Sequence, residues 1–133
     1  LAERGYLYSS SMKDCDWAYL WEKDQKELPL VELPNDITMD DFTYYYFTFS
    51  DPAVRCMYPN REALGNWKQE FDGLALEGNK IFILKLHPQM IGRASRIGMV
   101  GEFIAYMQNH GAWITTCEDV ARYVQKQNGG NRA

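Results

Sequence analysis

The sequence has 133 residues, of which 46% are hydrophobic and 24% charged, and its 14 Lys and Arg against 18 Asp and Glu give a net charge of −4. These values are ordinary for one folded domain and exclude an intrinsically disordered chain. Without a basic surplus, a nucleic-acid or anionic-membrane surface is not expected.

The three cysteines, Cys15, Cys56 and Cys117, are widely spaced and odd in number. Because they form no C-x-x-C pair, neither a disulfide framework nor a zinc ribbon is indicated. No apolar run approaches the ~20 residues of a membrane span, and no signal peptide is visible. We therefore expect a reducing, cytoplasmic setting.

The first residues have the pattern of a helix end. Leu1–Arg4 are mostly good helix formers that finish on a basic residue, and Gly5 follows where a left-handed residue commonly closes a helix. A helix end without a helix start leads us to expect truncation upstream of Leu1. A frayed, processed terminus is the alternative.

Two short strands are predicted next, at Gly5–Ser9 and at Leu30–Pro34, where the proline ends the second. Asp40–Phe49 is rich in tyrosine and phenylalanine, which favours a strand. Its apolar positions do not alternate, however, so its structure stays open.

From position 60 onward, helices and strands are expected to alternate. Apolar residues recur at three- and four-residue spacing in two segments, which predicts helices at 60–77 and 95–110. A capping box, formed by Thr115 with Glu118 or by Thr116 with Asp119, predicts a final helix through Val124. Apolar runs between them predict strands at 81–86 and 112–115. This alternation indicates an α/β fold with a parallel sheet of three or four strands. So small a sheet leaves open edges, which a partner chain or further strands would have to close.

Two glycines, Gly98 and Gly101, lie inside the second of these helices. Each weakens a helix by about 1 kcal/mol relative to alanine. We therefore expect the helix to pack closely against a neighbour there. Residues 127–133 are polar and are predicted to form a flexible tail.

His87 is the first candidate for chemistry. It follows directly on the most apolar segment and precedes Pro88, a place where α/β folds bind ligands beyond their strand ends. Histidine there suits general acid or base work; the alternative is a ring that merely satisfies a loop. His110 precedes Gly111 at a predicted helix end, where a cation meets the helix dipole, and we expect it to be structural.

Two acidic pairs lie in predicted loops, Asp14 with Asp16 and Asp40 with Asp41. Such pairs can bind a metal or a polar substrate, but in loops they commonly cap helices or face solvent. Because the two histidines are far apart and lack i,i+4 spacing, we expect no metal to be held by this chain alone. No G-x-S-x-G nucleophile motif occurs.

Four segments, in this order, carry a family resemblance. Gly5–Ser11 is similar to a G-Y-x-Y-D-S-S motif, and Asp16 with Tyr19 to a D-x-P-Y loop. Leu30–Pro34 followed by Asp40–Tyr45 is similar to E-L-P … D-D-x-P-Y. The fourth comprises Leu86–Arg96, a helix and then Trp113–Thr116. Together these segments resemble the C-terminal half of a polysaccharide deacetylase (NodB-homology) domain, closest to the peptidoglycan deacetylase and allantoinase-like subgroup.

The resemblance implies the fold class and the organisation of the chain. Residues 1–126 would be the C-terminal portion of an irregular (β/α) barrel of the NodB deacetylase type, incomplete by itself. The implied reaction is hydrolysis of a C–N bond in an N-acetylated sugar polymer or a small ureide. His87 would be the general acid. The other site residues that the resemblance implies, as substrate contacts or pocket architecture, are Asp16, Glu32, Asp41 and Arg93.

The departures from the family concern the groups that activate water. The catalytic base, the metal ligands and the arginine that orients the base belong upstream of Gly5 in this family. A divalent, zinc-like metal would therefore be held only by a complete domain, and we expect this chain alone to be an inactive part of a hydrolase. Ser9, Ala18 and Ile37 stand where the family often has Asp, Pro and Trp, which leaves the substrate open.

The alternative is a non-catalytic half-barrel that binds or assembles through its open sheet edges. A homo-oligomer and a missing N-terminal half are thus both open as the partner. A stable symmetric dimer would favour the assembly module.

Overall fold

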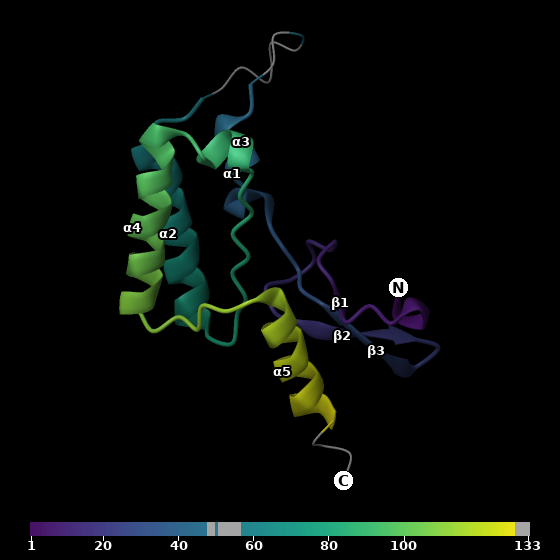
Figure 1. Ribbon diagram of the computed structural model, residues 1–133. Coiled ribbons are helices and arrows are strands. Elements are labelled where there is room, and N and C mark those ends of the chain that lie inside the picture. Colours follow the sequence, from purple (N-terminus) through teal and green to yellow (C-terminus); the bar gives the residue numbers. More distant parts are fainter. Residues whose placement is uncertain (48–49, 51–56, 130–133) are drawn as a thin grey trace. The chain divides into compact units, whose positions relative to one another are not determined.

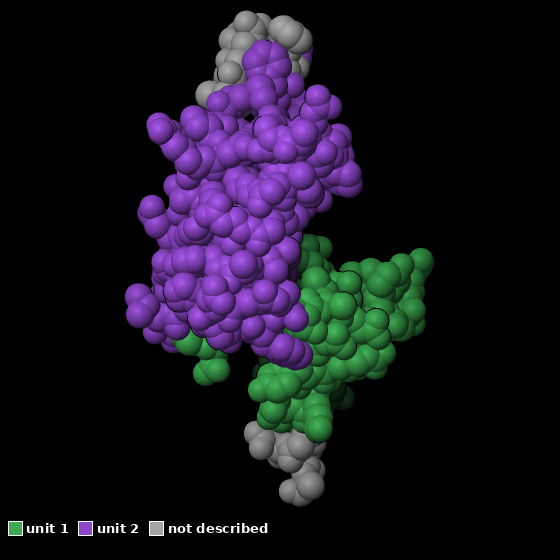
Figure 2. Space-filling view, turned by 60° about the vertical axis from the view of Figure 1, so that its left-hand side comes forward, with its two compact units in different colours: residues 1–35, 78–81, 115–133 green, residues 36–77, 82–114 purple. Residues whose placement is uncertain are grey.

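The computed structural model describes residues 1–47, 50 and 57–129 (Figure 1). The chain divides into two compact units, which Figure 2 colours separately. Unit 1 comprises residues 1–35, 78–81 and 115–133, and unit 2 comprises residues 36–77 and 82–114. Among the described residues, no helix is both long and apolar enough to cross a membrane. Each unit is described in turn.

Unit 1 contains a three-stranded sheet. Its strands are β1 (Tyr8–Ser9), β2 (Tyr19–Lys23) and β3 (Lys26–Glu32), in the order β1-β3-β2. β1 runs parallel to β3, whereas β2 is antiparallel to it. The hairpin between β2 and β3 turns through Asp24 and Gln25, whose φ angles of 52° and 62° are those of a two-residue hairpin turn with both central residues left-handed.

Helix α5 (Cys117–Gly129) packs against β3, and its Ala121 is fully buried. Thr116 caps it: the Thr116 hydroxyl accepts the Asp119 amide proton at 3.1 Å and donates to the Asp119 carboxylate at 2.7 Å. This is one of the two caps that the sequence predicts. The helix extends beyond the predicted end at Val124, and residues 130–133 of the predicted tail lie outside the described part. Near the N-terminus, the short 3-10 helix η1 (Ala2–Arg4) closes at Gly5, which has the predicted left-handed conformation (φ 75°).

Unit 2 is helical. It contains the 3-10 helix η2 (Ile37–Met39) and the helices α1 (Asp41–Tyr45), α2 (Asn60–Glu77), α3 (Pro88–Ile91) and α4 (Ala94–Asn109). The long helices α2 and α4 lie side by side in Figure 1 and contact each other. Their buried faces form a core that includes Trp67, Phe71 and Phe103. The Trp67 and Phe103 ring centroids lie 5.9 Å apart.

The long helices are confirmed, but two predicted strands are wrong. Residues 81–86 form only an isolated bridge, between Lys85 and Asp40, and residues 112–115 form no strand. The sheet also contains the antiparallel strand β2, which the sequence analysis missed, so the all-parallel expectation is wrong. The close packing expected at Gly98 and Gly101 is wrong as well, because a Cβ at either position would meet nothing within 4 Å.

The ambiguous segment from Asp40 to Phe49 begins as a helix, α1, and Thr48 and Phe49 lie outside the described residues. Short polar caps explain why tyrosines of high strand propensity are helical here. The Asp36 side chain accepts the Thr38 amide proton at 2.8 Å, and the Asp40 side chain accepts the Phe42 amide proton at 2.9 Å. Tyr44 and Tyr45 are then buried in the core of unit 2.

Candidate active site

Two segments that are distant in sequence meet through the bridge between Asp40 and Lys85. The Lys85 amide donates to the Met39 carbonyl at 2.9 Å, and the Asp41 amide donates to the Lys85 carbonyl at 3.1 Å. This parallel pairing fixes the register of the two segments. It places the start of α1 beside His87, which lies two residues beyond Lys85.

Asp41 binds His87 through both of its carboxylate oxygens. Asp41 Oδ1 lies 2.6 Å from His87 Nδ1, and Asp41 Oδ2 accepts the His87 backbone N–H at 2.8 Å. The Asp41 side chain is fully buried, whereas the His87 side chain is 37% exposed. One buried carboxylate thus fixes both the backbone and the ring of a histidine that remains accessible.

The hydrogen bond determines which ring nitrogen is available. An ionised carboxylate only accepts hydrogen bonds, so Nδ1 carries the proton and Nε2 is left for chemistry. The Phe42 ring packs against the imidazole, with centroids 4.6 Å apart. Arg96 of α4 contacts both α3 and α1. It donates to the Met90 carbonyl at 2.8 Å, and its guanidinium carbon lies 4.0 Å from the centroid of the Tyr45 ring.

Asp40, Asp41 and His87 also satisfy the distances of a metal site. Each offers one ligand atom, and the three atoms lie within 4.8 Å of one another, so the group could hold an ion. Two contacts favour a hydrogen-bonded network over a metal site at these residues. His87 Nδ1 is at hydrogen-bond distance from Asp41, and the Lys85 ammonium lies 3.0 Å from Asp40 Oδ2. An ion would have to displace the ring proton and face the lysine charge, so we derive no chemistry through a metal at this group.

Glu32 lies in unit 1, where it is fully buried at the end of β3. Its Oε1 accepts the amide protons of Ser11 and Met12 at 2.7 and 2.9 Å, and its Oε2 accepts the Trp21 indole proton at 2.9 Å. Burial by itself raises the pKa of the Glu32 carboxyl, but these hydrogen bonds outweigh burial and hold the pKa below its ordinary value of 4.5. The contacts are those of a charged anchor for the loop after β1.

The remaining sequence candidates have simpler surroundings. In unit 1, the Asp16 carbonyl accepts the Ile81 amide proton at 2.8 Å. Its neighbour Asp14 accepts a hydrogen bond from the Tyr19 hydroxyl at 3.0 Å; burial, together with this bond, raises the pKa of Tyr19 to about 12. In unit 2, Arg93 is exposed and precedes α4, with its carbonyl accepting the Arg96 amide proton at 2.8 Å.

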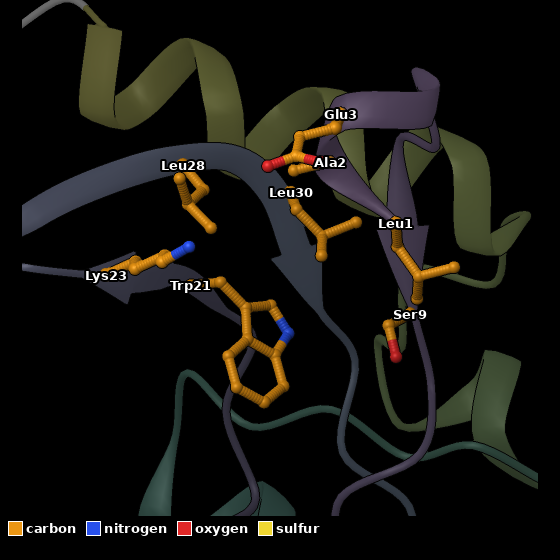
Figure 3. Close-up of a pocket in the computed structure, with 8 residues that line it drawn as sticks. All are labelled: Leu1, Ala2, Glu3, Ser9, Trp21, Lys23, Leu28 and Leu30. Carbon is orange, nitrogen blue, oxygen red and sulfur yellow. The ribbon is translucent and has the colours of Figure 1, made fainter.

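Unit 1 also contains a pocket of about 380 Å³ (Figure 3). Its lining is mostly apolar, with Leu1, Trp21, Leu28 and Leu30. Because the Trp21 indole is hydrogen-bonded to Glu32, the buried carboxylate also fixes one wall of this pocket. None of the five residues proposed for the site from sequence lines it.

The structure therefore brings together His87 and Asp41, and it adds Asp40 and Lys85, which sequence reasoning did not connect to His87. The signal for Asp40 was present, since an acidic pair before a helix start invites capping. Nothing in the sequence marked Lys85 as a site residue, because a single lysine in an apolar run indicates only an interruption of a strand.

No protein-family model matches the sequence, and neither does any curated protein. Solved structures do match. One assigned to a polysaccharide deacetylase from Mycobacterium smegmatis has a TM-score of 0.82 and 27% identity, covering 96% of this chain. One assigned to a polysaccharide deacetylase from Pseudomonas aeruginosa PAO1 has a TM-score of 0.75 and 28% identity, covering 94% of this chain. The allantoinase PuuE gives a TM-score of 0.75 and 26% identity, also over 94% of this chain.

The coverage is unequal in the two directions. The chain spans 44% of the M. smegmatis protein and 41% of each of the other two. The match therefore extends over nearly all of this chain and over less than half of the proteins that it resembles. The chain has the mixed α/β fold of part of a NodB-type polysaccharide deacetylase domain, a fold that it shares with deacetylase and allantoinase structures.

Proposed function

We propose that this chain is part of a hydrolase of C–N bonds and that His87 is its general acid. The observation that carries the proposal is the buried Asp41 carboxylate, which holds both the backbone and Nδ1 of an accessible histidine. The structural similarity to deacetylases and an allantoinase supports the reaction class. Deacetylation of an N-acetyl sugar and opening of a ureide ring both break a C–N bond with water.

The geometry suits proton donation to a leaving nitrogen. When the ring is protonated, Nδ1–H remains on Asp41 and Nε2–H can be given to the nitrogen as the C–N bond breaks. The Asp41 carboxylate stabilises the imidazolium and orients it, as the acid does in other Asp–His pairs. General acid catalysis of this kind contributes about a hundredfold to ten-thousandfold in rate.

Activation of the attacking water is left to residues outside this chain. A divalent metal ion can supply a hydroxide near neutral pH, and we propose that its ligands lie in the part of the domain that this chain does not span. Asp16 and Arg93 remain candidates for substrate contact. Glu32 has its carboxylate engaged by Ser11, Met12 and Trp21, and we propose a supporting role for it.

A second candidate function is a non-catalytic assembly module. The observation in its favour is the sheet of unit 1, which has three strands among the described residues and leaves the five-residue strand β2 at one edge. Such an edge can pair with a strand of another chain. A stable symmetric dimer of the purified chain, measured by sedimentation, would favour this function, and a monomer would not.

The test of the hydrolase proposal is a completed domain. This chain is fused to the portion of the M. smegmatis protein that it does not span, and the fusion is assayed on an N-acetylated chito-oligosaccharide and on allantoin. We expect turnover of one of them and a loss of about a hundredfold or more on His87→Ala. A fusion that unfolds cooperatively on heating, and is therefore folded, yet hydrolyses neither compound would contradict the proposal.

A further inference from the structure

Two adjacent carboxylates lie within reach of one ring nitrogen. Asp41 Oδ1 is 2.6 Å from His87 Nδ1, and Asp40 Oδ1 is 3.6 Å from the same atom. A change in side-chain torsion could bring Asp40 to the ring. Since the ring orientation depends on which carboxylate accepts its proton, something must favour Asp41.

Lys85 engages the competing carboxylate. Its ammonium lies 3.0 Å from Asp40 Oδ2, while Asp40 Oδ1 accepts the Phe42 amide proton at 2.9 Å. The two side chains are only 28% and 16% exposed, so solvent screens this pair less than an ion pair on the open surface. Asp40 is thereby held at both of its oxygens.

The backbone places the lysine where this selection requires it. The bridge between Asp40 and Lys85 sets the two residues side by side, and the same pairing brings His87 to Asp41. One strand-like contact thus fixes two pairings, a cation on the first carboxylate and an imidazole on the second.

We propose that Lys85 is a positioning residue, which holds Asp40 away from His87 so that Asp41 alone accepts the Nδ1 proton and Nε2 stays available. The catalytic consequence rests on the function proposed above. The positioning itself is a property of the 133-residue chain and is tested without any assay of activity.

The experiment measures the protonated nitrogen of His87 by side-chain ¹⁵N NMR. The chain has only two histidines, His87 and His110, so the spectrum is readily assigned. Spectra are recorded at about pH 8, above the ordinary titration range of histidine. For the parent chain we expect the Nδ1–H tautomer of His87.

The decisive comparison starts from Asp41→Asn, whose single acceptor oxygen is needed by the His87 backbone N–H, so that its NH2 group faces Nδ1. We expect this variant to lose much of the Nδ1–H tautomer, because Lys85 still holds Asp40. Adding Lys85→Met should release Asp40 and restore the Nδ1–H population by about threefold or more, the size expected for loss of a partly shielded ion pair. Adding Lys85→Arg should not restore it. Adding Asp40→Asn to the Asp41→Asn, Lys85→Met variant should abolish the recovery.

Equal tautomer ratios in Asp41→Asn with and without Lys85→Met would overturn the proposal. If Asp41→Asn does not fold, the comparison of Lys85→Met with Lys85→Arg decides instead. The downfield resonance of the His87 Nδ1 proton should then move upfield in Lys85→Met, as freed Asp40 draws the proton from its short bond, and stay in place in Lys85→Arg. An unchanged resonance in both variants would overturn it as well. Inactivity of the completed domain would count against the proposed function and leave these spectra unaffected.

Discussion

Asp41 accepts two hydrogen bonds from His87, one from the backbone amide at 2.8 Å and one from ring Nδ1 at 2.6 Å. The carboxylate is buried and the ring is accessible, so the pair combines a fixed orientation with an exposed reactive nitrogen. Because Asp41 begins α1 and His87 precedes α3, this pair also joins these two short helices.

Removal of the Asp41 carboxylate should destabilise unit 2. Asp41→Ala leaves the His87 amide and ring without their acceptor, and hydrogen bonds to a charged group are each worth about 1.5–3 kcal/mol. We expect a loss of about 2–4 kcal/mol in the free energy of unfolding, measured by urea denaturation. Asp36→Ala is the matched control, because it removes a cap from the Thr38 amide and should cost only about 1 kcal/mol. Equal losses in the two variants would contradict the anchoring role of Asp41.

Glu32 should make stability depend on acid pH. Its folded-state pKa is lowered, so its contribution is complete above the ordinary value of 4.5 and is lost as the pH falls through the lower folded value. Glu32→Gln cannot accept the Trp21 indole proton through its amide nitrogen, and we expect it to lose about 1–3 kcal/mol near neutral pH. The measurement is urea unfolding at neutral pH and at about pH 3. The variant should show a smaller decline between them, and a decline as steep as the parent's would argue against this role.

Two glycines in unit 2 should respond in opposite directions to alanine. A Cβ at Gly92 would collide with the backbone carbonyl oxygen of Pro88, directly after His87. We expect Gly92→Ala to cost about 1–3 kcal/mol through the shift of that turn. Gly98 lies inside α4 with nothing within 4 Å of a new Cβ, so Gly98→Ala should stabilise by about 0.5–1 kcal/mol. Thermal unfolding of the two variants measures both changes in stability. A destabilised Gly98→Ala would show that a neighbour covers α4 after all.

The purified chain should not hydrolyse either class of substrate. A general acid without a group that activates water has no route through amide or ureide hydrolysis. We expect no turnover of an N-acetylated chito-oligosaccharide or of allantoin above the buffer rate, with or without added zinc. Turnover that disappears on His87→Ala would show that this chain holds the missing group itself.

The sequence predicted the helical part of the fold better than the sheet. The helices α2 and α4 follow from apolar residues at helical spacing, among them Trp67, Phe71 and Val100, which belong to the core of unit 2. β2 was missed because its strand character depends on pairing with β3 across a turn of two left-handed non-glycine residues. The run from Ile81 to Leu86 is apolar enough for a strand, but its pairing in the structure is limited to one bridge.

The candidate site could likewise be predicted only in part from the sequence. His87 could be identified from its place after an apolar run, and Asp41 from its acidic pair with Asp40 and from the family resemblance. Their contact depends on the register of the bridge between Asp40 and Lys85, a tertiary feature that spacing along the chain does not encode. The role of Lys85 depends on the same bridge, so it emerges only once the two segments are paired.

The completed domain tests the central claim most directly, because it compares the two histidines of the chain in one enzyme. His87→Ala should lower kcat by about a hundredfold or more. His110→Ala should leave kcat within about twofold, because the His110 ring packs against Tyr106 at a helix end and lies at no reacting group in this account. A His87→Ala variant that is folded and as active as His110→Ala would contradict the assignment of His87 as the general acid.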